Sequence, residues 1–303
     1  MKTFIKASLL IILICSSELY AKDITVTLLG TGTPRPDINR FGPATLIEYK
    51  NKKFLFDAGR GVTMRLRQAG VELSEINQVF ITHLHSDHII GFDDLLLTGW
   101  IWQRQGSLHV YGPEGISLFI QNIKGAYSED INFRNKHTLL EIDNLEIISH
   151  TIKTDIKIYD EDGLTITAFS VNHGIVEPSF GYLIKTSEHS VVISGDTSYS
   201  ENLVHHSQGV DLLIHELAAI NSHLLKQNKK LRKIAGYHTS IEEMQQVLSE
   251  TAPKVTVFSH LLLLGISEEE VLNAIKNTYS KPVYMGKDLL TIKIGQNIRV
   301  IEP

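Results

Sequence analysis

The most constraining feature of this sequence is a cluster of metal-ligand side chains at the end of an apolar strand. The strand is predicted at Val79–Thr82, and His83, His85, Asp87 and His88 follow it directly. Alternate residues of an extended segment point the same way, so His83 and His85 can share one metal ion. The chain then turns, so that Asp87 and His88 can serve a second ion nearby. Two ions about 3.5–4 Å apart stabilise the transition state of a hydrolysis. The cluster therefore predicts a dinuclear hydrolytic site.

The composition limits which side chains can bind the metal ions, and therefore which metals are expected. Cys15 is the only cysteine, which excludes a thiolate site and a disulfide scaffold, whereas the chain contains 14 histidines. The ligands must then be imidazole and carboxylate groups, a set that favours two Zn²⁺ ions, with Mn²⁺ or Fe as alternatives. The net charge of −5 argues against a nucleic-acid binder that relies on whole-protein charge, and 43% hydrophobic residues argue against a disordered chain.

Residues 1–21 have the features of a secretory signal peptide. Lys2 and Lys6 give a positive start, a short apolar run follows, and Ala21 is a small residue suited to the last position before cleavage. The apolar run is too short to cross a bilayer. The alternatives are a buried first element and a lipid anchor on Cys15. We expect a periplasmic or secreted protein that is not integrated in a membrane.

Residues 22–303 are predicted to form a single hydrolase domain of two packed mixed sheets with outer helices, an α/β architecture. Two helix starts carry a capping box, Ser240 with Glu243 and Ser267 with Glu270. The strands are rich in β-branched or aromatic residues and are expected at Ile24–Leu29, Ala44–Tyr49, Lys53–Phe56, Val79–Thr82, Leu164–Val171, Gly181–Ile184, Val191–Ser194, Leu212–Ile214, Val255–Phe258 and Leu289–Ile294. The helices are expected at about Gly61–Gln68, Gly115–Ile123, Ile241–Ser249 and Glu268–Asn277.

The segment from His83 to His88 resembles the HxHxDH motif of the metallo-β-lactamase superfamily. Four further segments resemble other motifs of that superfamily: Phe56-Asp57-Ala58-Gly59, His173 in Val-Asn-His-Gly, Ser194-Gly195-Asp196-Thr197 and Phe258-Ser259-His260. The resemblance implies an αββα sandwich in which Asp57 supports the metal loop. For the first metal it implies the ligands His83, His85, His173 and bridging Asp196. For the second metal it implies the ligands Asp87, His88, Asp196 and His260.

Two further segments indicate a branch of the superfamily. Leu213-Ile214-His215-Glu216 resembles the His-Glu motif of the ribonuclease Z-like phosphodiesterases, and Gly236-Tyr237-His238-Thr239-Ser240 resembles their His-Ser-Thr motif, with Thr and Ser exchanged. In that group the glutamate orients the histidine, which protonates the leaving oxygen. An alkoxide leaving group needs such a proton, and a histidine held by a carboxylate is suited to give it. His215 is expected to have a supporting role.

The chain also departs from ribonuclease Z. It carries a predicted signal peptide and has no clear Gly/Pro-rich arm, so tRNA binding is not expected. The opening from Leu29 to Pro43 is similar to an exported arylsulfatase-like branch, and cyclic-nucleotide phosphodiesterases are also close. Arg40 and Arg60 are candidates for holding an anion or for surface ion pairs. The basic run 226–233 fits either an anion-attracting surface or a solvated helix face.

These observations predict an exported dinuclear zinc hydrolase that acts on a small anionic ester or nucleotide, either a phosphodiester or an aryl or alkyl sulfate. A metal hydroxide attacks, Asp87 helps to orient it, and His238 with Glu216 protonates the leaving group. The alternative enzyme class hydrolyses a carbonyl centre, as a lactonase, thioesterase or β-lactamase does. The aromatic segment Gly99–Trp102 is expected to pack in the core or at the interface of a homodimer.

Overall fold

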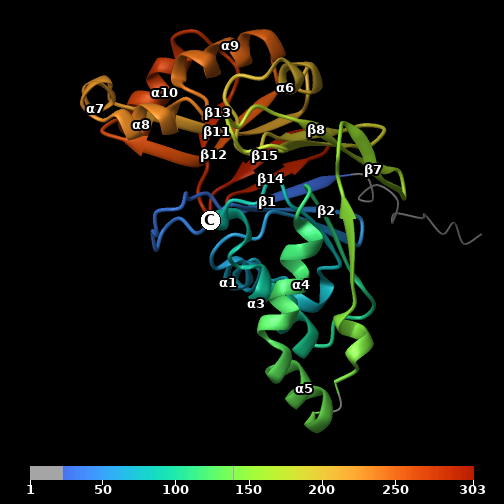
Figure 1. The fold of residues 1–303 in the computed structure, drawn as a ribbon. Coiled ribbons are helices and arrows are strands. Elements are labelled where there is room, and N and C mark those ends of the chain that lie inside the picture. The colour runs from blue at the N-terminus through green and yellow to red at the C-terminus, as the bar shows by residue number, and fades with distance from the viewer. Residues whose placement is uncertain (1–22, 139) are drawn as a thin grey trace, which may run out of the picture.

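The computed structural model describes residues 23–138 and 140–303, so the predicted signal peptide at 1–21 lies outside the described residues. Two sheets face each other and helices cover both outer surfaces (Figure 1). This arrangement confirms the predicted α/β architecture of two packed mixed sheets. Among the described residues, no helix has the length and apolar character needed to span a membrane.

Within the described part of the chain, the first sheet has eight strands in the order β15-β14-β1-β2-β3-β4-β5-β6. Its pairs are antiparallel from β15 to β3 and parallel from β3 to β6. The strands are β1 Ile24–Gly30, β2 Ala44–Tyr49, β3 Lys52–Phe56, β4 Gln78–Phe80, β5 Leu108–Gly112, β6 Ile147–Thr151, β14 Thr291–Ile294 and β15 Ile298–Ile301.

The second sheet of the described residues has seven strands in the order β13-β12-β11-β10-β9-β8-β7. The pairs from β10 to β13 are parallel and those from β7 to β10 are antiparallel. The strands are β7 Ile156–Glu161, β8 Leu164–Ser170, β9 Phe180–Lys185, β10 Ser190–Ile193, β11 Leu212–Ile220, β12 Val255–Leu264 and β13 Val283–Met285.

The helices form the outer layers, and α4 and α5 project away from the sandwich (Figure 1). Both predicted capping boxes are present at the starts of α9 and α10. The helices on the first sheet's side are α1 Val62–Gln68, α2 Ser86–Ile89, α3 Phe92–Ile101, α4 Ile116–Ala126 and α5 Ser128–His137, with short 3-10 helices at Leu73–Glu75 and Ile142–Leu145. Those on the second sheet's side are α6 Glu201–His206, α7 Ser222–Gln227, α8 Lys229–Ala235, α9 Ile241–Thr251 and α10 Glu268–Lys276.

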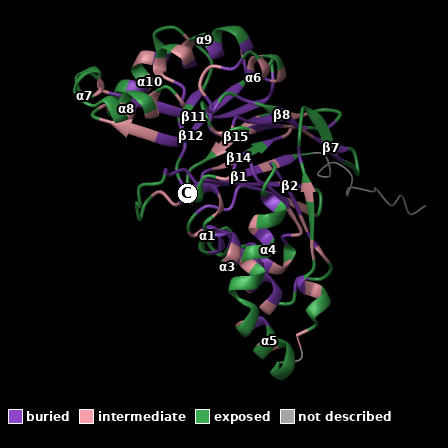
Figure 2. Ribbon diagram, viewed as in Figure 1, coloured by how far each residue is buried: buried purple, intermediate pink, exposed green. Residues whose placement is uncertain are grey.

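Apolar side chains from the facing surfaces of the two sheets make the central core. Figure 2 shows buried residues along the strands of both sheets. Phe80 lies at its middle and stacks on Phe56 and Tyr111, with ring centroids 4.9 and 4.8 Å away. Tyr182 of the opposite sheet contacts this stack edge-on and donates its buried hydroxyl to the carbonyl of Ile81 at 2.6 Å. Fully burying one such aromatic side chain stabilises the fold by about 1.5–3 kcal/mol. The core therefore fixes the strand end from which the metal loop emerges.

The largest departures from the predicted elements are explained by polar composition and burial. Helix α5 is missed because its sequence is polar and buries Ile131 alone among its described residues. Strand β11 runs to Ile220, well beyond the predicted Leu212–Ile214, since His215 and Glu216 are buried within it. In the segment predicted to pack in the core or at a dimer interface, Trp100 is buried and donates to the carbonyl of Glu141 at 2.9 Å.

Candidate metal centre and active site

The loop after β4 is held by the carboxylate of Asp57. Its Oδ1 accepts the backbone N–H of Thr82 at 2.8 Å, and its Oδ2 lies 2.8 Å from Nδ1 of His88. Asp57 itself has a positive φ of 59°, a conformation that Asp tolerates better than most residues. A partner on Nδ1 fixes the ring of His88 and leaves its Nε2 for a metal. The geometry agrees with the supporting role that the family resemblance implied for Asp57.

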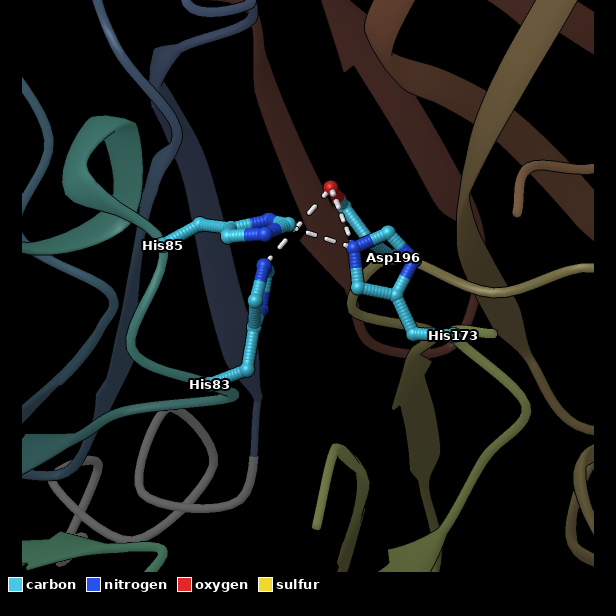
Figure 3. Close-up of side chains that lie close together, drawn as sticks. All are labelled: His83, His85, His173 and Asp196. Carbon is cyan, nitrogen blue, oxygen red and sulfur yellow. Dashed lines mark hydrogen bonds and ion pairs between the residues drawn. The ribbon is translucent and has the colours of Figure 1, made fainter. Parts of the chain in front are cut away.

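The structure brings His83, His85, His173 and Asp196 together (Figure 3). One ligand atom from each lies within 4.8 Å of the others. Nε2 of His173 is 3.2 Å from Nδ1 of His85, and Nε2 of His83 is 3.8 Å from Oδ2 of Asp196. His85 is exposed and the other three are buried, so this side of the centre opens to solvent.

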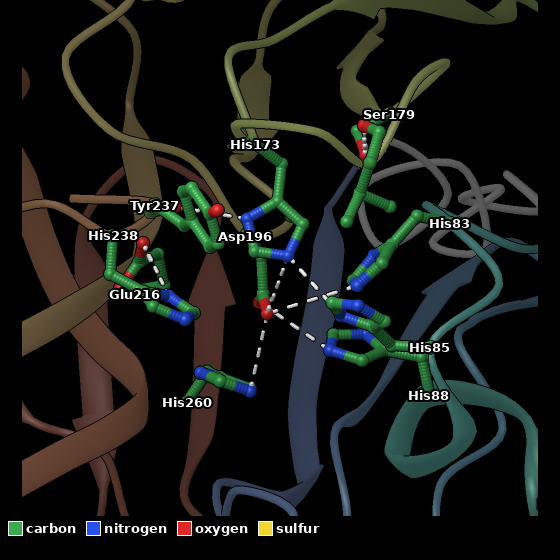
Figure 4. A network of polar contacts seen from close by, with 12 residues as sticks. His83, His85, His88, His173, Ser179, Asp196, Glu216, Tyr237, His238 and His260 are labelled. Atoms are coloured by element: carbon green, nitrogen blue, oxygen red, sulfur yellow. Dashed lines mark hydrogen bonds and ion pairs between the residues drawn. The ribbon is translucent and has the colours of Figure 1, made fainter. Parts of the chain in front are cut away.

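The structure also brings Asp87, His88 and His260 within 4.8 Å of one another. Nε2 of His260 lies 3.2 Å from Oδ2 of Asp87 and 3.4 Å from Oδ2 of Asp196. The other oxygen of Asp196 is 3.4 Å from Nε2 of His88. Asp196 thus lies between the two groups of ligands (Figure 4), as its predicted bridging role requires.

A β-bulge places His260 in the centre. Ser259 pairs with Glu216 and Leu261 pairs with Leu217, so His260 has no partner on β11. Its φ is 43°, which lies outside the extended region. An extra residue of this kind bends a strand and redirects a side chain. The bulge therefore turns His260 out of the ladder and towards Asp87.

The donor atoms of this centre fit divalent metal ions. Nε2 of His83, Nε2 of His88 and Oδ1 of Asp196 are buried and have no hydrogen-bond partner among the described residues. Buried polar atoms of this kind are costly unless they are paired or coordinated. Burial and the nearby His88 hold the pKa of His83 well below its usual range, which keeps the imidazole in the neutral form that a metal needs.

A second buried pair lies beside the metal ligands. Oε1 of Glu216 lies 3.1 Å from Nδ1 of His238 and accepts the backbone N–H groups of Thr197 at 3.2 Å and Thr239 at 3.0 Å. The imidazole of His238 stacks on His260 with ring centroids 5.6 Å apart. Burial disfavours the charged imidazole, but Glu216 and then Asp196 outweigh it and raise the pKa of His238 to about 9. The Glu216 carboxylate therefore favours the protonated form of His238.

His215 plays a different part from His238. It is buried, its Nδ1 lies 2.7 Å from the carbonyl of Glu216, and burial lowers its pKa to about 4. A neutral histidine bonded to the adjacent backbone suits the supporting role predicted for it.

The structure gives the two candidate anion-binding arginines different surroundings. Arg40 donates to Thr31 at 2.7 Å and to the carbonyl of Gly286 at 2.6 Å, and it pairs with Glu268. Its guanidinium therefore fastens the loop after β1 to the C-terminal part of the chain. Arg60 is exposed.

One contact could not be found by motif reasoning. Nδ1 of His173 lies 2.9 Å from the backbone carbonyl of Tyr237 (Figure 4). A hydrogen bond to a carbonyl fixes the tautomer of a metal-binding histidine and leaves Nε2 for the ion. Because the acceptor is backbone, the side-chain sequence carries no signal for it.

A family model described as "Anti-Pycsar protein Apyc1" matches residues 24–260. The chain belongs to the Apyc1 family. The Apyc1-family chain is also 30% identical to ribonuclease Z of Mycobacterium sp. (strain KMS) over 283 residues, which are 91% of this chain and 98% of that protein.

Solved structures show that this Apyc1-family chain has the metallo-β-lactamase fold, as the sequence predicted. The metallo-β-lactamase fold protein YhfI from Bacillus subtilis matches with a TM-score of 0.72 and 19% identity, over 90% of this chain and 100% of that one. The short form of human tRNase Z matches with a TM-score of 0.67 and 24% identity, over 88% of this chain and 98% of that one.

Proposed function

We propose that this protein is a zinc-dependent phosphodiesterase that expels an alkoxide leaving group. The observation that carries the proposal is the buried His238–Glu216 pair beside two sets of metal ligands. A hydrolase with a good leaving group can work with the metal site alone. A protonated histidine held next to that site is useful where the leaving oxygen needs a proton.

The expected ligands are those named from the sequence. We propose His83, His85, His173 and Asp196 for one ion, and Asp87, His88, Asp196 and His260 for the other. All are nitrogen or oxygen donors, which suits zinc. Bound zinc would supply a water of lowered pKa and positive charge opposite an anionic substrate.

The protein's own groups then have separate tasks. The carboxylate of Asp87 lies 3.2 Å from Nε2 of His260 and can accept a hydrogen bond from the attacking water, which orients it. Nδ1 of His238 is held by Glu216, so Nε2 carries the proton that is given to the leaving oxygen. Loss of that proton leaves a neutral imidazole whose Nδ1–H stays bonded to Glu216. After the product leaves, Nε2 takes up a proton from solvent, and the negative charge of Glu216 favours this step.

The relatives favour a phosphodiester among the anionic esters that the sequence left open. The relative at 30% identity is named ribonuclease Z, and a ribonuclease cleaves phosphodiester bonds of RNA. We therefore place the substrate of this chain among nucleotides and nucleic acids.

A substrate panel tests this proposal. We expect turnover of bis(p-nitrophenyl) phosphate, with little or none of p-nitrophenyl sulfate or nitrocefin, and two zinc ions per chain by elemental analysis. Preferential hydrolysis of the sulfate would assign a sulfatase, and preferential hydrolysis of nitrocefin would assign a carbonyl-directed enzyme. Glu243→Gln should show the same substrate preference as the wild type, because Gln also serves in a capping box and the change leaves Glu216 in place.

We also propose that the protein is exported to the periplasm or secreted, on the strength of Lys2, Lys6 and Ala21 in the sequence. Amino-terminal sequencing of the native protein should then find a start at or near Lys22. Retention of Met1 would refute the proposal.

A further inference from the structure

The longest stretch of unbalanced charge near the site is the helix pair α7–α8. No Asp or Glu occurs between Glu216 and Glu242, whereas that interval contains five basic residues, all of them between 226 and 233. The whole chain carries a net charge of −5, so this segment stands out against an acidic background. We call Lys226, Lys229, Lys230 and Lys233 the lysine patch.

The lysine patch is exposed and has no counter-charge of its own. All four side chains are exposed, and within the described parts of the chain none of them forms an ion pair with a carboxylate. Lys229 and Lys233 are four residues apart in α8, which places their like charges on one face of the helix, where they repel. A folded protein that keeps this repulsion has positive charge available for an external anion.

Arg232, the fifth basic residue, forms hydrogen bonds within the helix pair and joins the two helices. The guanidinium of Arg232 donates to the carbonyls of Leu225 and Lys226 at 2.7 and 2.9 Å, which joins the end of α7 to α8. Asn228 caps the start of α8 by accepting the N–H of Leu231 at 3.0 Å. The helix pair α7–α8 that carries the lysine patch is therefore held in a defined structure.

The helix pair α7–α8 is followed closely in the chain by His238, the residue that we assign as the acid. After α8 the turns continue, with the N–H of Tyr237 bonded to the carbonyl of Ile234 at 3.0 Å and that of His238 to Ala235 at 3.2 Å. Lys233 lies in the last turn of α8, five residues before His238 in the chain. Tyr237 also holds His173 through its carbonyl. The lysine patch is thus anchored at the leaving-group side of the site.

We propose that the lysine patch binds phosphates of a single-stranded oligonucleotide on the leaving-group side of the bond that is cleaved. The inference rests on the proposed function, because it takes His238 as the group beside the leaving oxygen. A mononucleotide has no phosphate that could span from His238 to Lys233 and beyond. An oligonucleotide has one phosphate for each further nucleotide, and contacts of this kind supply most of the sequence-independent affinity.

The composition of helices α7 and α8 favours nucleic acid over an anionic membrane as the ligand of the lysine patch. Of the larger apolar residues in α7 and α8, Leu224 alone is exposed, at 39%, and the others are partly buried, so the helix pair offers no continuous exposed apolar face. Peripheral membrane helices combine their basic residues with such a face.

Binding is the direct test. The probe is a fluorescein-labelled hexauridylate with phosphorothioate linkages, followed by anisotropy at several salt concentrations with the zinc-loaded protein. Replacing all four lysines by Gln should raise Kd at least about tenfold at low salt, and it should reduce the slope of log K against log salt by about 2, which is the change for three lost phosphate contacts on a single strand.

The matched control removes four exposed lysines on other elements, Lys124, Lys136, Lys185 and Lys293, and should leave Kd and slope as in wild type. Turnover of bis(p-nitrophenyl) phosphate by the wild type is measured in parallel, and its absence refutes the proposed function. If turnover is present but both variants bind hexauridylate like the wild type, the inference is wrong. Lysine-dependent pelleting with phosphatidylserine vesicles, without oligonucleotide binding, would also overturn it and assign the patch to a membrane.

Discussion

Replacing Glu216 by Gln should lower the alkaline limit of hydrolysis while the metal ligands stay in place. Glu216 and Asp196 raise the pKa of His238 from 6.5 to about 9 against the opposing effect of burial. Removing the charge of Glu216 removes the larger of these two contributions, and burial then holds the pKa at or below about 6.5. The amide still accepts the N–H groups of Thr197 and Thr239, so the loop geometry is retained.

The size of the effect follows from the fraction of His238 that carries a proton. With a pKa of about 9, nearly all of it is protonated at pH 7, whereas with a pKa of about 6.5 only about a quarter is. We expect kcat/KM to fall at least about fourfold at pH 7 and about 30-fold at pH 8, with little loss at pH 6. The difference in pKa corresponds to about 3 kcal/mol.

The assay compares two leaving groups over pH 6–9.5. A dinucleotide expels a nucleoside alkoxide that needs the proton, whereas the p-nitrophenyl ester of the same nucleotide expels a phenolate that is stable without it. The shift of the alkaline limit should be seen with the dinucleotide and be weak with the nitrophenyl ester, at unchanged zinc content. A loss that is equal for both esters and independent of pH would refute the role of His238 as the acid.

Four further predictions test the centre and its support. Asp196→Ala should reduce zinc from the two ions per chain that we propose to fewer than one by elemental analysis, because it removes the carboxylate between both ligand groups. Asp57→Ala leaves Nδ1 of His88 without its partner and should lower zinc affinity about 10- to 100-fold in a chelator competition, whereas unchanged affinity would contradict its supporting role. Ser240→Ala removes the cap of α9 and should lower the free energy of unfolding by about 1 kcal/mol in urea, with zinc content unaffected. The pKa of His215 is lowered in the folded state, so the unfolded state binds more protons below pH 6.5. The free energy of unfolding should therefore fall between pH 7 and pH 5, and the fall should be about 2 kcal/mol larger in the wild type than in His215→Gln.

Four of the candidate ligands, His83, His85, Asp87 and His88, were predicted from their position after a clearly marked strand, whereas the other three were predicted from the family resemblance. His83 comes after a β-branched and aromatic run, and Asp196 follows the strand Val191–Ser194. Such side chains meet once the strands share one end of the sandwich. The backbone contacts that orient the ligand side chains were not predicted. The bulge at His260 and the carbonyl of Tyr237 are backbone features, and neither the type nor the spacing of side chains reports them.

Two of the elements that the sequence missed, β6 and α5, have a weak pattern of burial. Strand β6 has only partly buried and exposed residues, so it lacks the alternation that identifies a strand. Helix α5 is stabilised by its contact with α4 and by an ion pair between Asp130 and Arg134 that spans one helical turn. Both elements lie away from the metal centre, so their omission did not affect the prediction of its residues.

The ligands that we propose for each ion come from parts of the chain that are far apart, and this affects the order of folding. His260 and Asp87 are separated by 173 residues, and His173 and His85 by 88. Loops of that length are closed late, after local strand pairs have formed. Metal binding cannot then start the folding of this chain, although it does so in small zinc domains. The metal binds to a centre that exists only after the distant parts of the chain have come together. Zinc should accordingly slow the unfolding of the native protein and leave the rate of its refolding unchanged, and a zinc-dependent refolding rate in stopped-flow fluorescence would contradict this order.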